Sequence, residues 1–312
     1  MLKRVTGREM RTTLTELSFL TALKHPSIMR VHRIAFTPQS ISFSMPTYRM
    51  NLEDYLVGQS DRAALQSIVL ECAMGLDYLH SKDIIHADLK PANIFVVIRE
   101  SRAFGAVIGD CGLSRLAVPQ PTLHHIQTPI YRAPEAIIGS VPTVAIDNWS
   151  LGVIVAEMLG LKVRINTEDA SRYACEYYLL PHTDIREQNI ARLERLSSGE
   201  QSARVCRALG AVADTPLGKI ASGCLRYTVV SRLRAAQAAQ ILAPAYQPRE
   251  RSPIAGARSH ILALKTTLPV DTLCKAATGI EKAITGQVPR ITDDEFEAAK
   301  KLSSERHGQV LL

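Results

Sequence analysis

The sequence predicts an α+β fold in which a small mixed N-terminal part precedes a larger, mainly helical part. Apolar residues recur at helical spacing over 8–24 and 65–80, whereas those of 28–43 alternate loosely, as in two strands. Apolar runs at both ends of 94–108 flank a polar turn and indicate a hairpin. From Ile146 onward the pattern is helical.

Local signals mark the ends of these elements. The first helix carries leucines at three-residue spacing and ends at His25-Pro26, because the residue before a proline avoids helical geometry. One face of the second helix is apolar, with Ile68, Val69, Cys72, Leu76 and Leu79. The segment 246–258 holds prolines, a glycine and several charges and is predicted to be a linker. Beyond it, Thr292 and Glu295 form a capping box that opens a last short helix.

The composition is that of a globular chain. Of 312 residues, 46% are hydrophobic and 21% are charged, which excludes a mainly disordered protein. The formal net charge of +7 is spread along the chain without a Lys/Arg block, so we expect no nucleic-acid partner. The longest apolar stretch, 151–161, contains Glu157 and is shorter than the about 20 residues of a membrane span. We therefore expect no membrane span.

Cysteine usage indicates the compartment. The six cysteines show neither C-x-x-C spacing nor the pattern of a disulfide framework. The N-terminus carries Lys3 and Arg4 but lacks the apolar core of a secretory signal. We expect reduced thiols and an intracellular protein, in the cytoplasm, the nucleus or both.

The strongest chemical pattern begins at His86, in the stretch HADLKPAN. Asp88 can orient and deprotonate a hydroxyl group, Lys90 can neutralise a phosphoryl group, and the amide oxygen of Asn93 can bind a metal ion. A second carboxylate, Asp110, lies in the stretch GDCG, whose glycines allow a sharp turn. Two oxygen ligands together with nucleotide phosphates suit Mg²⁺, so the pattern predicts phosphoryl transfer.

These motifs resemble those of the eukaryotic protein kinase family, where they take the forms H-R-D-L-x-x-x-N and D-F-G. Further matches follow in the family's order within residues 1–240: a helix with Glu16, the activation-segment end Thr128–Glu135, the D-x-W-S-x-G stretch Asp147–Gly152, and Arg232. Lys90 is typical of the Ser/Thr branch. Arg132 is similar to its counterpart in cyclin-dependent kinases, which implies a preference for proline after the target residue. The Met-Pro-x-Tyr stretch at Met45–Tyr48 resembles the corresponding stretch of herpesvirus-type Ser/Thr kinases.

The resemblance implies a bilobal protein-kinase-like fold. Residues 1–50 would form a partial N-lobe with a short antiparallel sheet and the glutamate-bearing helix, and 51–245 a mainly helical C-lobe. Beyond the resemblance, the residue pattern predicts that 246–312 are a linker and a helical C-terminal extension, which would dock a regulatory protein or pack on the domain. Glu135 paired with Arg232 would brace the large lobe. Asp147 would tie the catalytic loop, residues 86–93, to the helix that begins near Asp147.

The resemblance also implies catalytic roles. Asp88 would act as the base that accepts the substrate hydroxyl proton, and Lys90 would steady the phosphoryl group. Asn93 and Asp110 would hold Mg²⁺. Thr128 would bridge to Asp88 and Lys90.

For the nucleotide, the resemblance implies a separate set of contacts. Lys3 would contact the α- and β-phosphates of ATP while paired with Glu16. Met45 would be the gatekeeper of the hinge, and backbone groups near Thr47 and Tyr48 would meet adenine. An ordinary edge strand and turn is the other interpretation of these hinge residues.

The chain departs from the family pattern at several places. No glycine-rich loop precedes Lys3, so the N-lobe is expected to be truncated and to bind ATP less tightly. Ala87 replaces the arginine that binds an activation-loop phosphate, which implies activity without loop phosphorylation. Cys111 and Ala92 replace the phenylalanine of D-F-G and a glutamate of the catalytic loop, and the smaller thiol would pack more loosely.

We hypothesise that the chain is a Ser/Thr protein kinase, which transfers the γ-phosphoryl group of ATP to Ser/Thr hydroxyls of protein substrates with Mg²⁺ as cofactor. A pseudokinase that binds nucleotide or scaffolds a partner is the alternative, because the glycine-rich loop is missing. A small-molecule phosphotransferase with a related H-x-D-x-x-x-x-N loop is a third hypothesis. Against it, Thr128–Glu135 and Asp147–Gly152 are typical of kinases that act on proteins.

Overall fold

The chain divides into two compact units. The computed structural model describes residues 2–6, 10–37, 40–57, 61–100, 102–117, 126–137, 140–161 and 198–253. The first unit includes Met1–Lys24 and Met29–Thr47, and the second includes His25–Ile28 and Tyr48–Ala255. Within the described residues, no helix combines the length and the apolarity needed to cross a bilayer.

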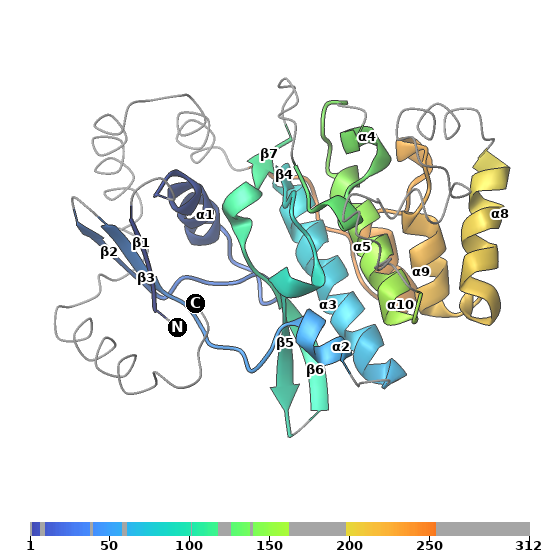
Figure 1. Ribbon diagram of the computed structural model, residues 1–312, viewed down its shortest axis with the longest axis horizontal. Coiled ribbons are helices and arrows are strands. Elements are labelled where there is room, and N and C mark those ends of the chain that lie inside the picture. The colour runs from blue at the N-terminus through green and yellow to red at the C-terminus, as the bar shows by residue number, and fades with distance from the viewer. Residues whose placement is uncertain are drawn as a thin grey trace, which may run out of the picture. The chain divides into compact units, whose positions relative to one another are not determined.

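The described part of the first unit is a small antiparallel sheet with one helix (Figure 1). Its elements are β1 (Leu2–Thr6), α1 (Met10–Ala22), β2 (Arg33–Thr37) and β3 (Ser40–Ser44), and the strand order is β1-β3-β2. The central strand β3 buries Ile41 and Phe43, and Phe43 pairs with Lys3 on one side and Ile34 on the other. The helix predicted over 8–24 and the two strands predicted within 28–43 are confirmed.

The second unit, as far as the structure describes it, is mainly helical and contains two short two-stranded sheets (Figure 1). Its elements are α2 (Leu52–Leu56), α3 (Arg62–Ser81), β4 (Ile84–Ile85), β5 (Ile94–Arg99), β6 (Arg102–Ile108), β7 (Arg115–Leu116), α4 (Pro134–Ile137), α5 (Ala145–Met158), α8 (Ser198–Leu209), α9 (Pro216–Cys224) and α10 (Ala235–Leu242). Strand β4 pairs with β7, and β5 pairs with β6 as the predicted hairpin.

Helix α3 supports the hairpin on one side. Its N-terminus is capped by Asp61, whose side chain accepts hydrogen bonds from the free N–H groups of Ala63 and Ala64. The apolar face that the sequence predicts is buried, as Ile68 and Leu76 illustrate. Strand β6 packs against α3, so the loops at both ends of the hairpin are held on a rigid helix.

Helix α5 is the core of the second unit because almost every residue on all its sides is buried, including Trp149. It meets α9 at very short range. A Cβ atom placed on Gly152 would lie 2.7 Å from the Cβ of Cys224 and 3.0 Å from a side-chain atom of Leu225. A glycine is therefore required for the two helices to approach this closely.

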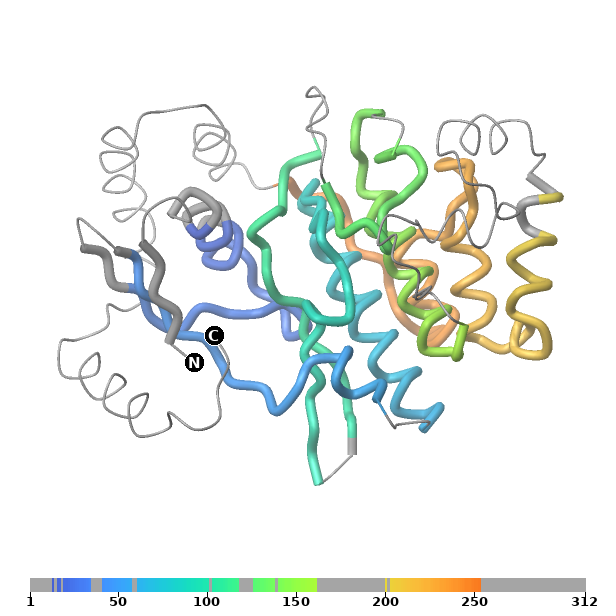
Figure 2. The backbone as a smooth tube through the Cα atoms, viewed as in Figure 1, coloured from blue at the N-terminus to red at the C-terminus, as the bar shows by residue number. Residues whose placement is uncertain are grey.

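The chain after α10 returns along α3 (Figure 2). The Tyr246 hydroxyl donates to Asp77 at 2.7 Å, and the backbone N–H of Arg249 donates to the same carboxylate oxygen at 3.0 Å. Arg251 binds Asp83 through two hydrogen bonds of 2.8 Å. These contacts hold 246–253, the described part of the predicted linker, against α3 and the turn that follows it. The rest of that segment and the helix predicted at Thr292 lie outside the described residues.

Candidate active site

Asp147 shapes the backbone of the catalytic loop, which leaves β4 at His86. This carboxylate, fully buried in the first turn of α5, accepts hydrogen bonds from the backbone N–H groups of His86 at 2.8 Å and Ala87 at 2.9 Å. His80 lies 3.0 Å from it. Ala87 has a φ of 66°, a left-handed conformation that costs roughly 1–2 kcal/mol for a residue with a side chain. The Asp147 contacts stabilise this turn.

The His86 ring joins the catalytic loop to the second motif. Its Nε2 lies 3.0 Å from the carbonyl oxygen of Gly109, and its Nδ1 accepts the backbone N–H of Asp88 at 3.3 Å. Both contacts are satisfied by the neutral tautomer that carries its proton on Nε2. The ring therefore fixes the distance between the two chain segments that carry Asp88 and Asp110.

The four predicted catalytic residues meet at the carboxylate of Asp88, which is 6% exposed. Oδ2 of Asp88 accepts hydrogen bonds from Lys90 Nζ at 2.8 Å and Asn93 Nδ2 at 3.1 Å. Oδ1 accepts the Thr128 hydroxyl at 2.7 Å and the Thr128 backbone N–H at 3.2 Å. Lys90 also donates to the Thr128 hydroxyl at 3.2 Å. The carboxylate is thus held in one orientation, with a cation beside it.

Asn93 and Asp110 are brought together by the β5–β6 hairpin. Asn93 precedes β5, Asp110 follows β6, and the N–H of Gly109 donates to the carbonyl oxygen of Asn93 at 2.9 Å. Both contacts that orient the Asn93 side chain use Nδ2, including one of 2.9 Å to the carbonyl oxygen of Asp88. This leaves the amide oxygen as the atom that the predicted metal ion would contact. Asp110 is exposed with a φ of 57°. An amide oxygen and a carboxylate fit Mg²⁺, which prefers oxygen ligands.

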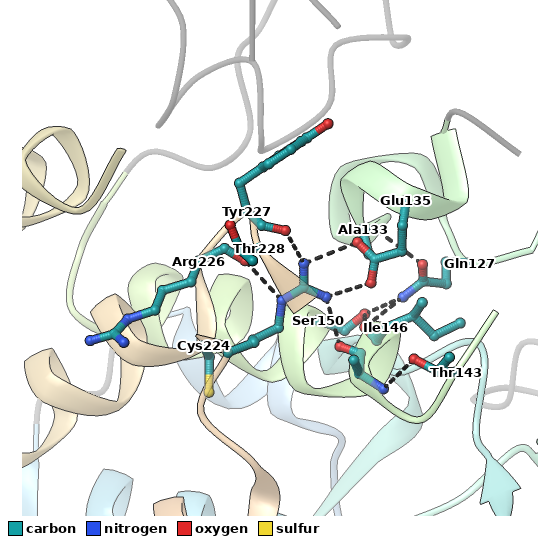
Figure 3. A network of polar contacts seen from close by, with 12 residues as sticks. Gln127, Ala133, Glu135, Thr143, Ile146, Ser150, Cys224, Arg226, Tyr227 and Thr228 are labelled. Atoms are coloured by element: carbon teal, nitrogen blue, oxygen red, sulfur yellow. Dashed lines mark hydrogen bonds and ion pairs between the residues drawn. The ribbon is translucent and has the colours of Figure 1, made fainter. Parts of the chain in front are cut away.

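Gln127 is the residue that the sequence analysis missed (Figure 3). It is 3% exposed, and its side-chain nitrogen donates to Ser150 Oγ at 2.8 Å and to the carbonyl oxygen of Ile146 at 3.0 Å. Its side-chain oxygen accepts the N–H of Ala133 at 3.0 Å. A single glutamine beside Thr128 has no periodicity or spacing to reveal it. Its position between Ile126 and a predicted catalytic residue is the one signal available.

The backbone of Gln127 is as constrained as its side chain. Its φ is 63°, and its N–H donates to the carbonyl oxygen of Ala87 at 3.0 Å. Its own carbonyl oxygen accepts two hydrogen bonds from the guanidinium of Arg132, at 2.8 Å and 3.3 Å. The residue before Thr128 therefore directs its carbonyl group to Arg132.

Glu135, which Figure 3 labels, forms a buried ion pair with Arg232 in the same region. The guanidinium contacts both carboxylate oxygens, at 2.5 Å and 3.0 Å, and also donates to the carbonyl oxygens of Ala145 and Tyr227. The pair connects α4 to the chain between α9 and α10. Sequence reasoning predicted this contact and the one between Asp147 and the catalytic loop.

The predicted nucleotide contacts are distributed over both units. Lys3 lies on β1, and its side chain is outside the described residues. Glu16 is buried in α1 and Met45 is buried after β3, whereas Thr47 is exposed. In the second unit, the ring of Tyr48 contacts that of Phe95, with centroids 5.6 Å apart. The roles of these residues toward ATP stay predictions. Cys111 is fully buried.

The fold and this site define a protein kinase domain of mixed α+β structure. A lysine, an asparagine and a threonine fix the carboxylate of Asp88, and a buried Glu–Arg pair braces the helical unit. The sequence matches the family model of the protein kinase domain over residues 1–242. The chain belongs to the protein kinase family.

Curated relatives agree with this assignment. Over 151 residues, 47% of this chain, it is 34% identical to a probable CTD kinase subunit alpha homolog of Encephalitozoon cuniculi. Over 156 residues, 48% of the chain, it is 34% identical to a probable cell division protein kinase of that organism. Over 174 residues, 51% of the chain, it is 33% identical to the serine/threonine-protein kinase SSN3 of Mycosarcoma maydis. The matches cover 45%, 56% and 24% of these relatives, respectively.

Proposed function

We propose that this chain is a Ser/Thr protein kinase that transfers the γ-phosphoryl group of ATP to Ser/Thr hydroxyls of protein substrates inside the cell. The observation that carries the proposal is the environment of Asp88, which binds Lys90, Asn93 and Thr128 at once. The names of the three relatives support it: a probable CTD kinase subunit alpha homolog, a probable cell division protein kinase and a serine/threonine-protein kinase. The two compact units would be the lobes of a bilobal kinase.

In this proposal the side chains act as follows. Asp88 accepts the proton of the substrate hydroxyl, and its hydrogen bonds to Thr128 and Asn93 keep the accepting oxygens in place. The ammonium group of Lys90 lies next to that carboxylate and offsets negative charge on the phosphoryl group. Asn93 and Asp110 would hold Mg²⁺, which when bound neutralises charge on the β- and γ-phosphates.

The contact between Arg132 and Gln127 supports a preference for proline after the target residue. A substrate that places its hydroxyl at Asp88 would run its next residue past Gln127 and Thr128. The carbonyl group of Gln127 already accepts two hydrogen bonds from Arg132, so it is directed away from a substrate N–H. An ordinary residue there would lose a partner for its N–H group, whereas proline has no N–H to satisfy.

The pseudokinase alternative keeps the same fold and predicts nucleotide binding without transfer. Its motive is the sequence, in which Ala87 and Cys111 replace family residues. One assay separates the two functions, because only a kinase transfers phosphate in a way that depends on Asp88.

The experiment is radiolabelled phosphate transfer from Mg²⁺-ATP to paired peptides that differ only in proline or alanine after the target serine. Asp88→Asn should lower the rate about 10²–10⁴-fold. The exposed carboxylate Asp54 supplies a matched control, and Asp54→Asn should leave the rate unchanged. A folded chain that binds ATP but transfers no phosphate above the Asp88→Asn background would replace the kinase proposal with the pseudokinase.

A further inference from the structure

If this kinase prefers proline after the target residue, its own sequence contains candidate target serines and threonines. The chain has four Ser-Pro or Thr-Pro pairs, beginning at Thr37, Thr128, Thr215 and Ser252. The Thr128 hydroxyl is bound to Asp88, and that of Thr215 caps α9 through the N–H of Gly218 and donates to Val212. The side chain of Thr37 lies outside the described residues. Of the described hydroxyls in these pairs, that of Ser252 is the exposed one.

The backbone around Ser252 can leave the surface at small cost. Residues 249–253 are exposed and have no helix or strand structure, as a substrate segment must when it enters an active site. Three contacts hold residues 251 and 252 to the end of α3 and the turn after it. The N–H of Ser252 donates to the carbonyl oxygen of Ser81, Lys82 donates to the Ser252 hydroxyl, and Arg251 binds Asp83. The Arg251 side chain is 74% exposed, and ion pairs in water contribute little to stability.

A cation already lies where a phosphate on Ser252 would be. The ammonium group of Lys82 donates a hydrogen bond to the Ser252 hydroxyl oxygen. The nearby carboxylate of Asp83 is neutralised by Arg251. A phosphoserine carries a charge of about −1.5 to −2 at neutral pH and forms strong hydrogen bonds with such cations. The surface therefore suits the modified form of the segment better than the unmodified form.

We propose that Ser252 is a phosphorylation site that a second copy of this chain modifies, and that Lys82 binds the resulting phosphate. This inference rests on the proposed kinase function. The bond that forms joins Ser252 Oγ to the γ-phosphorus of ATP, and the bond that breaks joins that phosphorus to the β–γ bridging oxygen, which leaves with its electron pair on ADP. The serine proton passes to Asp88 of the copy that acts as the enzyme.

The test uses one tagged full chain carrying Asp88→Asn as the substrate and the untagged wild-type chain as the enzyme, with Mg²⁺-ATP. Mass spectrometry should find phosphate on Ser252 of the tagged chain, and Pro253→Ala in that chain should lower its rate at least tenfold. Phosphorylation of Ser-Pro peptides without any at Ser252 would overturn this inference and leave the kinase function intact. If phosphate were transferred neither to the peptides nor to Ser252, both the Ser252 inference and the proposed kinase function would be overturned.

The role of Lys82 has its own readout. Phosphorylated chain should unfold about 2–4 °C above unmodified chain, because the phosphate pairs with Lys82. Lys82→Gln should abolish this gain, while leaving phosphorylation of Ser-Pro peptides unchanged. A gain of the same size in Lys82→Gln, or no gain in the wild-type chain, would overturn the assignment of Lys82.

Discussion

Glu135 and Arg232 lie 97 residues apart in the sequence and bind each other through two hydrogen bonds in a buried site. A buried pair of this kind is costly to break on one side, because the remaining charge keeps no partner. The guanidinium of Arg232 also donates hydrogen bonds to the carbonyl oxygens of Ala145 and Tyr227, so it connects three separate chain segments.

The first prediction follows from that pair. Arg232→Met should lower the free energy of unfolding by about 3–5 kcal/mol, because the Glu135 carboxylate would stay buried without its partner. Urea denaturation measures the loss. The double variant Arg232→Met/Glu135→Gln removes both charges and should recover part of it. A double variant less stable than Arg232→Met would show that the unpaired carboxylate is not the cause.

Local motifs made much of the site predictable from sequence. Asp88, Lys90 and Asn93 lie within one turn-forming stretch, and the leucines of α1 and the apolar face of α3 follow helical periodicity. Gln127 could not be found this way, because its role depends on carbonyl groups that tertiary packing brings to it.

The segment after α10 is a similar case. Its prolines and charges predicted a linker, but the partners of Tyr246 and Arg249 are both Asp77, about 170 residues earlier in the chain. No local pattern contains such a contact. Composition predicts only the local conformational preference of a segment, whereas Tyr246 and Arg249 are held by hydrogen bonds to Asp77 on α3.

A second prediction concerns the loop backbone. Asp147→Asn keeps the size of the side chain but places an NH₂ group against one of the donors from His86, Ala87 or His80. Stability should fall by about 1–3 kcal/mol, and phosphate transfer should fall with it at temperatures where the variant is still folded. Urea denaturation and peptide assays measure the two effects. Unchanged transfer in folded Asp147→Asn would contradict the positioning role.

A third prediction separates specificity from rate. Arg132→Met releases the carbonyl group of Gln127, which can then accept a hydrogen bond from the N–H of a substrate residue. The ratio of kcat/KM for Ser-Pro over Ser-Ala peptides should fall about tenfold, which corresponds to about 1.4 kcal/mol. Arg234→Met, at an exposed arginine, is the matched control and should keep the ratio. An unchanged ratio in Arg132→Met would refute this account of proline preference.

A fourth prediction concerns pH. Burial, and secondarily the charge of Arg249, lowers the pKa of His25 to about 4, against the partly opposing effect of Asp77. The unfolded chain binds a proton at about pH 6.5 and the folded chain does not, so stability falls as the pH drops from about 6.5 to about 4. Through His25, a drop from pH 7 to pH 5 should lower the free energy of unfolding by about 2 kcal/mol.

The variant His25→Phe keeps an aromatic ring against Tyr78, with which His25 stacks at 5.0 Å. It should make the loss of stability between pH 7 and pH 5 about 2 kcal/mol smaller than in the wild-type chain. His32→Phe, at an exposed histidine, is the control. An equal loss of stability in His25→Phe and wild type would rule out His25 as the titrating group.

A fifth prediction tests the contact between α5 and α9. Gly152→Ala should destabilise the chain by about 1–3 kcal/mol, since the new methyl group would overlap Cys224. Removing the other side chain in Gly152→Ala/Cys224→Gly should recover part of the loss in thermal unfolding. No recovery would mean that backbone contacts, rather than the Cys224 side chain, set the spacing.

The dependence of the catalytic loop on Asp147 also has a consequence for synthesis on the ribosome. His86 and Ala87 emerge 61 and 60 residues before the carboxylate that accepts their N–H groups. Because chains grow by about 5–20 residues per second, the nascent loop exists for several seconds without the partner that stabilises the left-handed turn at Ala87. A chain released before α5 has been translated therefore carries the catalytic motif but lacks the contact that shapes it.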